Sequence, residues 1–93
     1  MRISWSRSAR ADQQRIWLFL AERSAAYADM AEARIESRVL SLAEFPRLGR
    51  LVAGTTVRRL SVAEIQYVID YELADEGVRV LRIRSTREGG DRL

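Results

Sequence analysis

The spacing of apolar residues changes at Pro46, and this change constrains the fold more than any other feature of the chain. Before Pro46, apolar residues recur at steps of three and four, which is typical of helices that bury one side. After it, they alternate with polar residues, which is typical of half-buried strands. A chain divided in this way is expected to lay its helices on one face of a sheet.

The first helix is predicted by Ile16, Phe19 and Leu20, which share one side of a helical pattern over about residues 9–24. Ser6 or Ser8 can cap its start, because a serine hydroxyl accepts a hydrogen bond from a backbone N–H group of the first turn. We therefore expect a helix that buries these three apolar side chains.

The second helix follows after a tight break and must end before Pro46. Two helices joined in this way form a hairpin in which each helix presents one apolar stripe. The residues that predict the second helix are Ala28, Ala31, Ile35, Val39 and Leu42.

Four stretches of the chain predict strands. The third has Ile65, Tyr67, Ile69 and Tyr71 on one face and polar residues mostly on the other. The last carries apolar residues on both faces, as expected of a covered, central strand. Residues 48–54 hold two glycines and predict a loop. The four predicted strands cover residues 2–6, 55–60, 65–72 and 78–84.

These elements predict an α+β fold of two layers, in the order strand, helix, helix and three strands. The helical hairpin covers one face of a small antiparallel sheet. The last three strands form a meander, and the first strand, remote in sequence, completes the sheet from one edge. We expect residues 1–88 to form one domain and residues 89–93 to form a flexible tail.

Composition limits the chemistry that the chain can perform. It has neither cysteine nor histidine, so it can form no disulfide and lacks the usual zinc and iron ligands. We therefore expect neither a metal site nor a cofactor. No apolar run reaches the length of a membrane span or of a signal peptide, so we expect a cytoplasmic protein that does not contact membranes.

All 16 basic residues are arginine, and the formal net charge is +3. Arginine codons are GC-rich, so the absence of lysine is first explained by genome composition. Where the arginines fall is therefore more informative than their number.

Short motifs recur along nearly the whole chain and resemble, in their order and spacing, the RelE/ParE toxin superfamily. The resemblance implies a protein that is toxic when free, is neutralised by a cognate ParD-like or RelB-like antitoxin and forms a hetero-oligomer with it. The motifs are Ile3-Ser4-Trp5-Ser6, the loop Pro46-x-x-Gly49-Arg50 after a helix, Tyr67-Val68-Ile69-Asp70-Tyr71, and Val80-Leu81-Arg82-Ile83.

One branch of this superfamily consists of ribosome-dependent messenger RNA nucleases, and several of their residues are missing here. Attack by a 2′-hydroxyl group needs a base and an acid, and arginine supplies neither. Val68 stands where that branch typically has an arginine, and Ser85 stands where many members have histidine. Only Arg87, Tyr67 and Tyr71 carry over, and the tyrosines could simply pack on the sheet.

The other branch poisons DNA gyrase by binding, and the pattern Tyr-Val-Ile-x-Tyr is its common form. We assign no catalytic residue on this interpretation. Paired strands could gather arginines into one basic patch, although a merely solvated arginine-rich face is an equal alternative. The candidates for toxicity or target binding are Arg58, Arg59, Tyr67, Tyr71, Arg82, Arg84 and Arg87.

The first helix also carries more apolar residues than one stripe needs, since residues 16–20 are apolar without a break. Some of these side chains must point away from the sheet, which favours a groove for an amphipathic helix of the antitoxin. The alternative is that the second helix and the following loop cover all five. The candidates for antitoxin binding are Trp17, Leu18, Leu20, Arg34, Arg38 and Arg59.

The leading hypothesis is a ParE-like toxin of a type II toxin-antitoxin system that inhibits DNA gyrase by binding. The alternatives are a ribosome-dependent nuclease of the RelE type and an inactive member retained as an antitoxin-binding protein.

Overall fold

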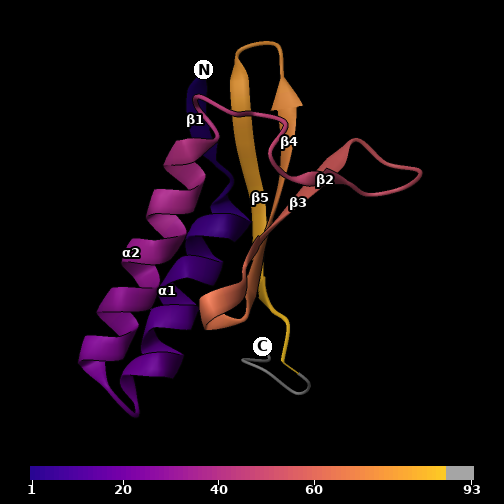
Figure 1. Cartoon of the computed structure of the whole chain (residues 1–93). Helices are drawn as coiled ribbons and strands as arrows, with labels where there is room; N and C mark the ends of the chain where they lie inside the picture. Colours follow the sequence, from indigo (N-terminus) through magenta and orange to yellow (C-terminus); the bar gives the residue numbers. More distant parts are fainter. Residues whose placement is uncertain (88–93) are drawn as a thin grey trace.

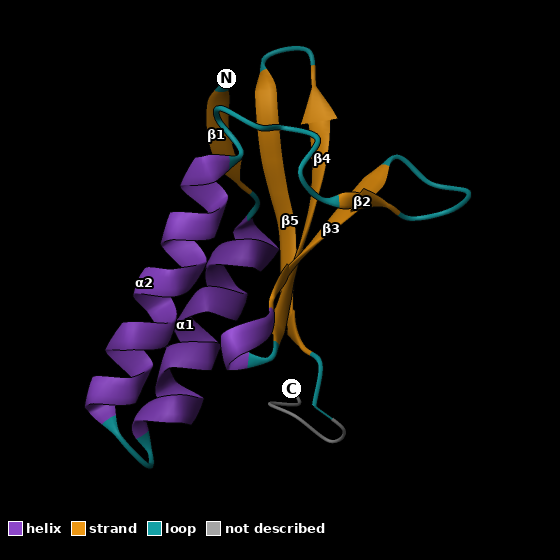
Figure 2. Ribbon diagram, in the orientation of Figure 1, coloured by secondary structure: helices purple, strands orange, loops and turns teal. Residues whose placement is uncertain are grey.

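The computed structural model describes residues 1–87 and confirms an α+β fold of two layers. Helices α1 and α2 lie side by side on one face of a twisted sheet, and the loop after strand β2 projects from the opposite side (Figures 1 and 2). The predicted tail at residues 89–93 lies outside the described residues. The elements are β1 (Arg2–Trp5), α1 (Arg7–Ala21), α2 (Ala25–Ser41), β2 (Arg50–Leu51), β3 (Val57–Val62), the 3-10 turn η1 (Ala63–Ile65), β4 (Tyr67–Ala74) and β5 (Gly77–Ser85).

Serine caps set the starts of both helices. The Ser6 hydroxyl accepts a hydrogen bond from the Ala9 N–H group at 2.9 Å, so Ser6 rather than Ser8 is the cap and α1 begins earlier than predicted. Ser24 was expected to end the first helix, but its hydroxyl accepts from the Tyr27 N–H group at 3.1 Å and begins the second. The break between the helices is therefore formed by residues 22–24.

The sheet has five strands in the order β1-β5-β4-β3-β2. The antiparallel meander of β3, β4 and β5 is confirmed, as is the edge position of β1. Strand β1 pairs with β5 in parallel, so the sheet is mixed at that edge. Gly77 is required there, because a Cβ atom on it would lie 2.1 Å from the Arg2 carbonyl oxygen.

Two of the predicted boundaries were wrong. Residues 48–54 do not form only a loop, because Arg50 and Leu51 pair with Arg59 and Arg58 as strand β2. The strand predicted from Ile65 begins at Tyr67, since residues 63–65 form η1 and Gln66 has a φ of 62°. Strand β2 depends on pairing with a separate strand, whereas η1 is closed by a local hydrogen bond from the Gln66 N–H group to the Ala63 carbonyl oxygen.

The core lies between the helices and the sheet. Ile16 and Leu20 pack there as predicted, but Phe19 is 42% exposed, because α1 turns that position away from the sheet. Residues Tyr67, Ile69 and Ile83 supply the sheet side of the same cluster. No helix within residues 1–87 is long and apolar enough to cross a membrane.

Asp12 on α1 joins the two layers. Strand β1 ends opposite Val80, so the backbone of β5 beyond that point is covered by α1 instead. The Ile83 N–H group donates to Asp12 Oδ2 at 2.8 Å, and the Arg82 guanidinium group donates to both carboxylate oxygens at 2.8 and 3.0 Å. Arg15 donates to Oδ1 at 2.7 Å. The buried carboxylate thus holds the helix against the edge of the strand.

These contacts also set the ionisation of Asp12. Burial alone would raise the pKa of this carboxyl group. The hydrogen bonds from Arg82, from the Ile83 N–H group and from Arg15 outweigh that effect and hold the pKa below its ordinary value of 3.8. Asp12 is therefore a charged residue that the fold requires.

Candidate functional site

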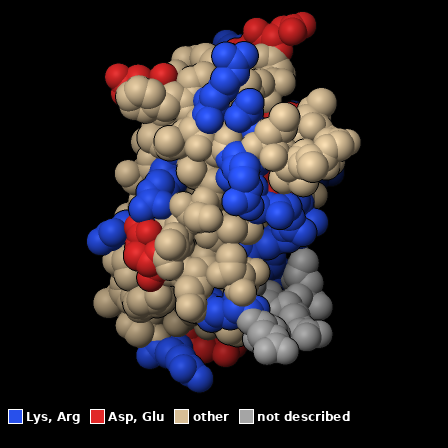
Figure 3. Space-filling model, turned by 45° about the vertical axis from the view of Figure 1, so that its right-hand side comes forward, with Lys and Arg blue, Asp and Glu red and all other residues tan. Residues whose placement is uncertain are grey.

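The sheet face that the helices leave open carries a row of charged side chains. Arg50, Arg59, Asp70 and Arg82 lie directly opposite one another on β2, β3, β4 and β5. Side chains opposite each other on neighbouring strands share a face of the sheet. Arg84 lies two positions along β5, on that same face. We call Arg50, Arg59, Arg82 and Arg84 the arginine cluster. Figure 3 shows basic side chains gathered along the middle of one side of the molecule.

Asp70 organises the centre of the cluster. Arg59 Nε donates to Asp70 Oδ1 at 2.7 Å, and Arg84 Nη2 donates to Oδ2. The carboxylate is only 6% exposed because the two arginines cover it. Its hydrogen bond and its charge raise the pKa of Arg59 above the ordinary value. Because Arg82 is paired with Asp12, the four positive charges face two carboxylates, so the cluster stays basic while its geometry is fixed.

Arg82 belongs both to the cluster and to the contact between the layers. Its pairing with Asp12, first by hydrogen bonding and then by charge, raises its pKa above the ordinary value. Its side chain nevertheless remains 42% exposed, and that of Arg84 remains 51% exposed. Both therefore keep N–H groups that a ligand can reach.

Tyr71 places Arg50 in the row. The Tyr71 hydroxyl donates to the Pro46 carbonyl oxygen and accepts from the Gly49 N–H group, both at 2.8 Å. A Cβ atom on Gly49 would lie 2.6 Å from the Tyr71 ring, so only glycine allows this approach. Arg58 Nη1 donates to the Gly49 carbonyl oxygen at 2.9 Å from the other side. The loop is thereby held beside β3, and Arg50 follows it into β2.

The candidate residues for target binding therefore divide into two groups. Arg59, Arg82 and Arg84 come together on the open face, whereas Tyr67 and Tyr71 are fully buried. The Arg58 side chain instead contacts the loop that contains Gly49. The sequence interpretation missed Arg50, because the only signal for it was the pairing of β2 with β3.

Arg87 lies apart from the cluster, against Tyr67. Its Nη2 atom donates to the Tyr67 hydroxyl at 3.0 Å, and its guanidinium carbon lies 5.2 Å from the centre of the ring. This contact combines a hydrogen bond with a cation-π interaction. The buried tyrosine thus positions Arg87 just beyond the end of β5.

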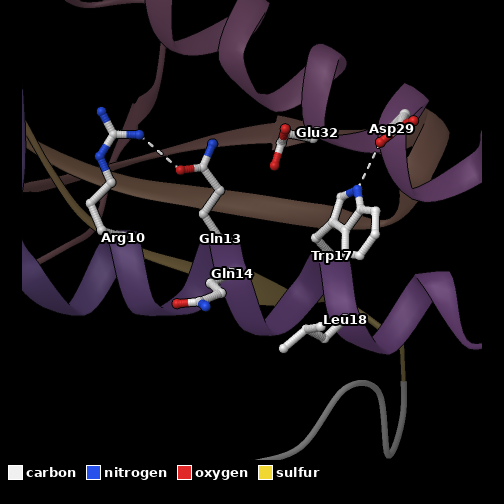
Figure 4. A pocket seen from close by; sticks show the side chains of 7 residues that line it. All are labelled: Arg10, Gln13, Gln14, Trp17, Leu18, Asp29 and Glu32. Atoms are coloured by element: carbon white, nitrogen blue, oxygen red, sulfur yellow. Dashed lines mark hydrogen bonds between the residues drawn. The ribbon is translucent and has the colours of Figure 1, made fainter. Parts of the chain in front are cut away.

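A groove of about 500 Å³ runs between the outer sides of α1 and α2. Trp17 lies across it, with its indole N–H group donating to Asp29 Oδ1 at 2.8 Å, and Leu18 is 57% exposed beside it (Figure 4). The lining residues are Arg10, Gln13, Gln14, Trp17, Leu18, Asp29 and Glu32.

The remaining candidates for antitoxin binding lie elsewhere. Leu20 is 8% exposed and packs in the core, so it does not contribute to the groove. Arg38 Nη2 and Arg34 Nη1 both contact Glu64 Oε2, at 2.7 and 3.3 Å. An acidic partner would have to compete with Glu64 for these two arginines.

Comparison with known proteins identifies the family. The family model described as "ParE toxin of type II toxin-antitoxin system, parDE" matches residues 3–89. The chain belongs to the ParE toxin family. It is also 38% identical over 82 residues to Toxin RelE2 of Caulobacter vibrioides, an alignment that covers 88% of this toxin and 91% of that protein. The resemblance inferred from the motifs is thereby confirmed.

Two solved structures share the fold of this ParE-family toxin. One is described as "Chromosomal ParDE TA system from P. aeruginosa", with a TM-score of 0.81, 22% identity and coverage of 94% of this toxin and 97% of that chain. The other is the isolated E. coli RelE toxin, with a TM-score of 0.69, 13% identity and coverage of 92% and 84%. At these identities the two structures support the fold alone.

Proposed function

We propose that this type II toxin inhibits DNA gyrase by binding to it, without cutting nucleic acid itself. The observation that carries the proposal is the composition of the open sheet face. This face presents arginines around Asp70, and both oxygens of Asp70 already accept hydrogen bonds from them. Such a surface can bind and orient a partner, but its guanidinium groups cannot accept a proton at neutral pH.

The chemistry of RNA cleavage supports the same choice. Val68 lies near the start of β4 on the open face, between Ser61 and Arg84 of the neighbouring strands. The two tyrosines that could take part in proton transfer are buried on the opposite side. Glu72 lies opposite Arg79 and away from the centre of the cluster. A base positioned next to the cluster is therefore not found among residues 1–87.

Membership of the ParE family implies a second partner, the antitoxin. We propose that an amphipathic helix of the antitoxin lies in the groove between α1 and α2. Leu18 offers an exposed apolar contact, while Trp17 supplies a large surface already fixed by Asp29. Aromatic side chains held in this way commonly supply much of the binding free energy at protein interfaces.

A ribosome-dependent nuclease is the second candidate. It is favoured by the contact between Arg87 and Tyr67, since both residues carry over from the nuclease branch and lie together. In this case Arg87 would stabilise charge on a phosphate group.

Two assays on the purified toxin separate these candidates. Incubation with gyrase and supercoiled plasmid is expected to accumulate cleaved plasmid, and incubation with translating ribosomes is expected to leave the message intact. Message cut at codons, with plasmid unchanged, would establish the nuclease instead. Normal growth of cells that express the folded toxin without its antitoxin would indicate an inactive member.

Arg87→Ala tests a candidate residue that both active functions share. We expect it to weaken growth inhibition roughly fivefold, because about 1 kcal/mol of charge-assisted interaction is lost. Dose-dependent growth inhibition in cells measures this effect, with Arg23→Ala on the helical side as the control. A fully toxic Arg87→Ala protein would remove this residue from the site.

A further inference from the structure

We propose that the arginine cluster binds the phosphodiester backbone of duplex DNA directly, with no other protein present. The inference deepens the proposed function, because a gyrase poison acts where gyrase holds DNA. It is tested without gyrase, so it can fail while the proposed gyrase inhibition stands.

The spacing of the cluster suits a duplex. Arg50, Arg59 and Arg82 lie on strands β2, β3 and β5. Strand β4, which carries Asp70, lies between β3 and β5. Neighbouring strands lie about 4.8 Å apart, so the row from β2 to β5 spans about 14 Å. The minor and major grooves of DNA are about 6 and 12 Å wide. The row is therefore long enough to contact phosphate groups on both sides of a groove.

The chemistry of the cluster suits phosphate. A guanidinium group presents parallel N–H donors that match two oxygens of one phosphate group, and it stays charged at all physiological pH values. Asp70 fixes Arg59 and Arg84 before any ligand arrives, which reduces the conformational entropy that binding would cost. Arg84 and Arg82 remain about half exposed, so the fixed donors are accessible.

The open face lacks the aromatic surface that single-stranded nucleic acids need. Proteins that bind single strands stack bases on exposed aromatic rings. Tyr67 and Tyr71 are both buried, and among residues 1–87 the strands carry no aromatic side chain on the open face. The open-face side chains between the arginines are Ser61 and Val68, neither of which offers a stacking surface for a base. Duplex DNA, read by its backbone and not by its sequence, fits these properties.

Fluorescence anisotropy with a labelled duplex of mixed sequence tests the proposal. We expect binding that weakens as NaCl rises from about 50 to 200 mM, because each neutralised phosphate contributes about −0.9 to the slope of log K against log salt. Contacts from three or four arginines predict a slope of about −3. Single-stranded DNA and RNA of the same sequence are expected to bind at least several-fold more weakly, since the face offers no stacking platform.

Matched variants locate the binding surface. Arg50→Ala combined with Arg84→Ala should lower duplex affinity at least tenfold and make the salt slope shallower by about two. Arg23→Ala, an exposed arginine beyond the end of α1, should leave both quantities unchanged. Arg50→Ala alone should lower the affinity several-fold and make the salt slope shallower by about one, which provides a second variant if the double substitution unfolds.

Three outcomes would overturn the inference. They are the absence of duplex binding at low salt, equal binding by the folded double variant, and tighter binding of a single strand than of the duplex. If the toxin binds no duplex and cleaved plasmid still accumulates with gyrase, the toxin acts on gyrase through protein contacts alone.

Discussion

The two outward faces of the molecule differ in how charge and apolar surface are combined. The groove between the helices mixes Asp29 and Glu32 with Trp17 and the exposed Leu18. The open sheet face concentrates arginines around Asp70 and offers little apolar surface. Although the formal net charge is only +3, charge is distributed unevenly: one surface combines charged with apolar residues, and the other is strongly basic. Surfaces of such different chemistry suit two different partners.

Asp12→Asn should have the largest effect, because Asp12 links helix α1, which lines the groove, to strand β5, which contains Arg82. We expect a loss of about 3 kcal/mol in the free energy of unfolding, since the substitution leaves buried donors without their charged acceptor. Urea unfolding followed by circular dichroism measures it. Asp75→Asn, in the exposed turn between β4 and β5, is the control and should change stability by less than about 0.5 kcal/mol.

The same residue predicts how stability depends on pH. Because the folded pKa of Asp12 lies below 3.8, the folded protein binds fewer protons than the unfolded chain as the pH falls. The contribution of Asp12 is thus fully present above the unfolded pKa and is lost as the pH falls through the lower folded value. In the Asp12→Asn protein this part of the acid dependence should disappear. An unchanged acid profile would contradict the assignment.

Leu18→Asp should affect binding at the groove between the helices but not binding at the open sheet face. We expect it to weaken antitoxin binding by about 2 kcal/mol, roughly thirtyfold, because a charge would replace an apolar contact in the groove. Isothermal titration calorimetry with the antitoxin measures this effect, and duplex DNA binding should not change. Leu40→Asp is the matched control, since Leu40 on α2 is 63% exposed but does not line the groove. Equal losses for both variants would place the antitoxin elsewhere.

Tyr71→Phe should have the smallest effect of the three substitutions, and it should affect binding at the open sheet face alone. Loss of the hydroxyl group leaves the Gly49 N–H group and the Pro46 carbonyl oxygen without their partner, at a cost of about 1–2 kcal/mol. Arg50 should lose its fixed position, so duplex DNA affinity should fall about threefold while antitoxin affinity stays constant. Tyr27→Phe, on the partly exposed side of α2, is the control in thermal unfolding. A Tyr71→Phe protein with unchanged DNA affinity would show that β2 holds its place without this hydroxyl group.

Local patterns predicted the layers and their order, because helix and strand periods depend on neighbouring residues. A serine cap at Ser6 or Ser8, the meander and the edge position of β1 were predicted in this way, and the structure selects Ser6. Strand β2 did not, because two residues carry no period and their pairing depends on Tyr71, more than twenty positions away. The prediction that Ser24 ends the first helix was wrong for a related reason. When the break between two helices is short, a serine that ends the first helix and a serine that caps the second have the same local sequence pattern.

The candidate site was predictable only in part. The sequence predicted that Arg58, Arg59, Arg82, Arg84 and Arg87 could gather into one patch. Arg58 contacts the loop and Arg87 lies against Tyr67, whereas Arg59, Arg82 and Arg84 share the open face. That Asp70 would hold two of them, and that Asp12 would hold the third, depends on distances across strands and layers. The exposure of Leu18 was foreseen from the excess of apolar residues on the first helix, whereas the burial of Leu20 followed from the rotation of that helix on the sheet.

The pairing of β1 with β5 affects when the protein can become active during its synthesis. Residues Arg2 to Trp5 are synthesised long before their partners in β5, residues 77–80. The Asp12 carboxylate likewise waits for Arg82 and Ile83. Contacts between segments so distant in sequence form late. The open basic face, which needs β5, therefore cannot assemble before β5 itself has been synthesised.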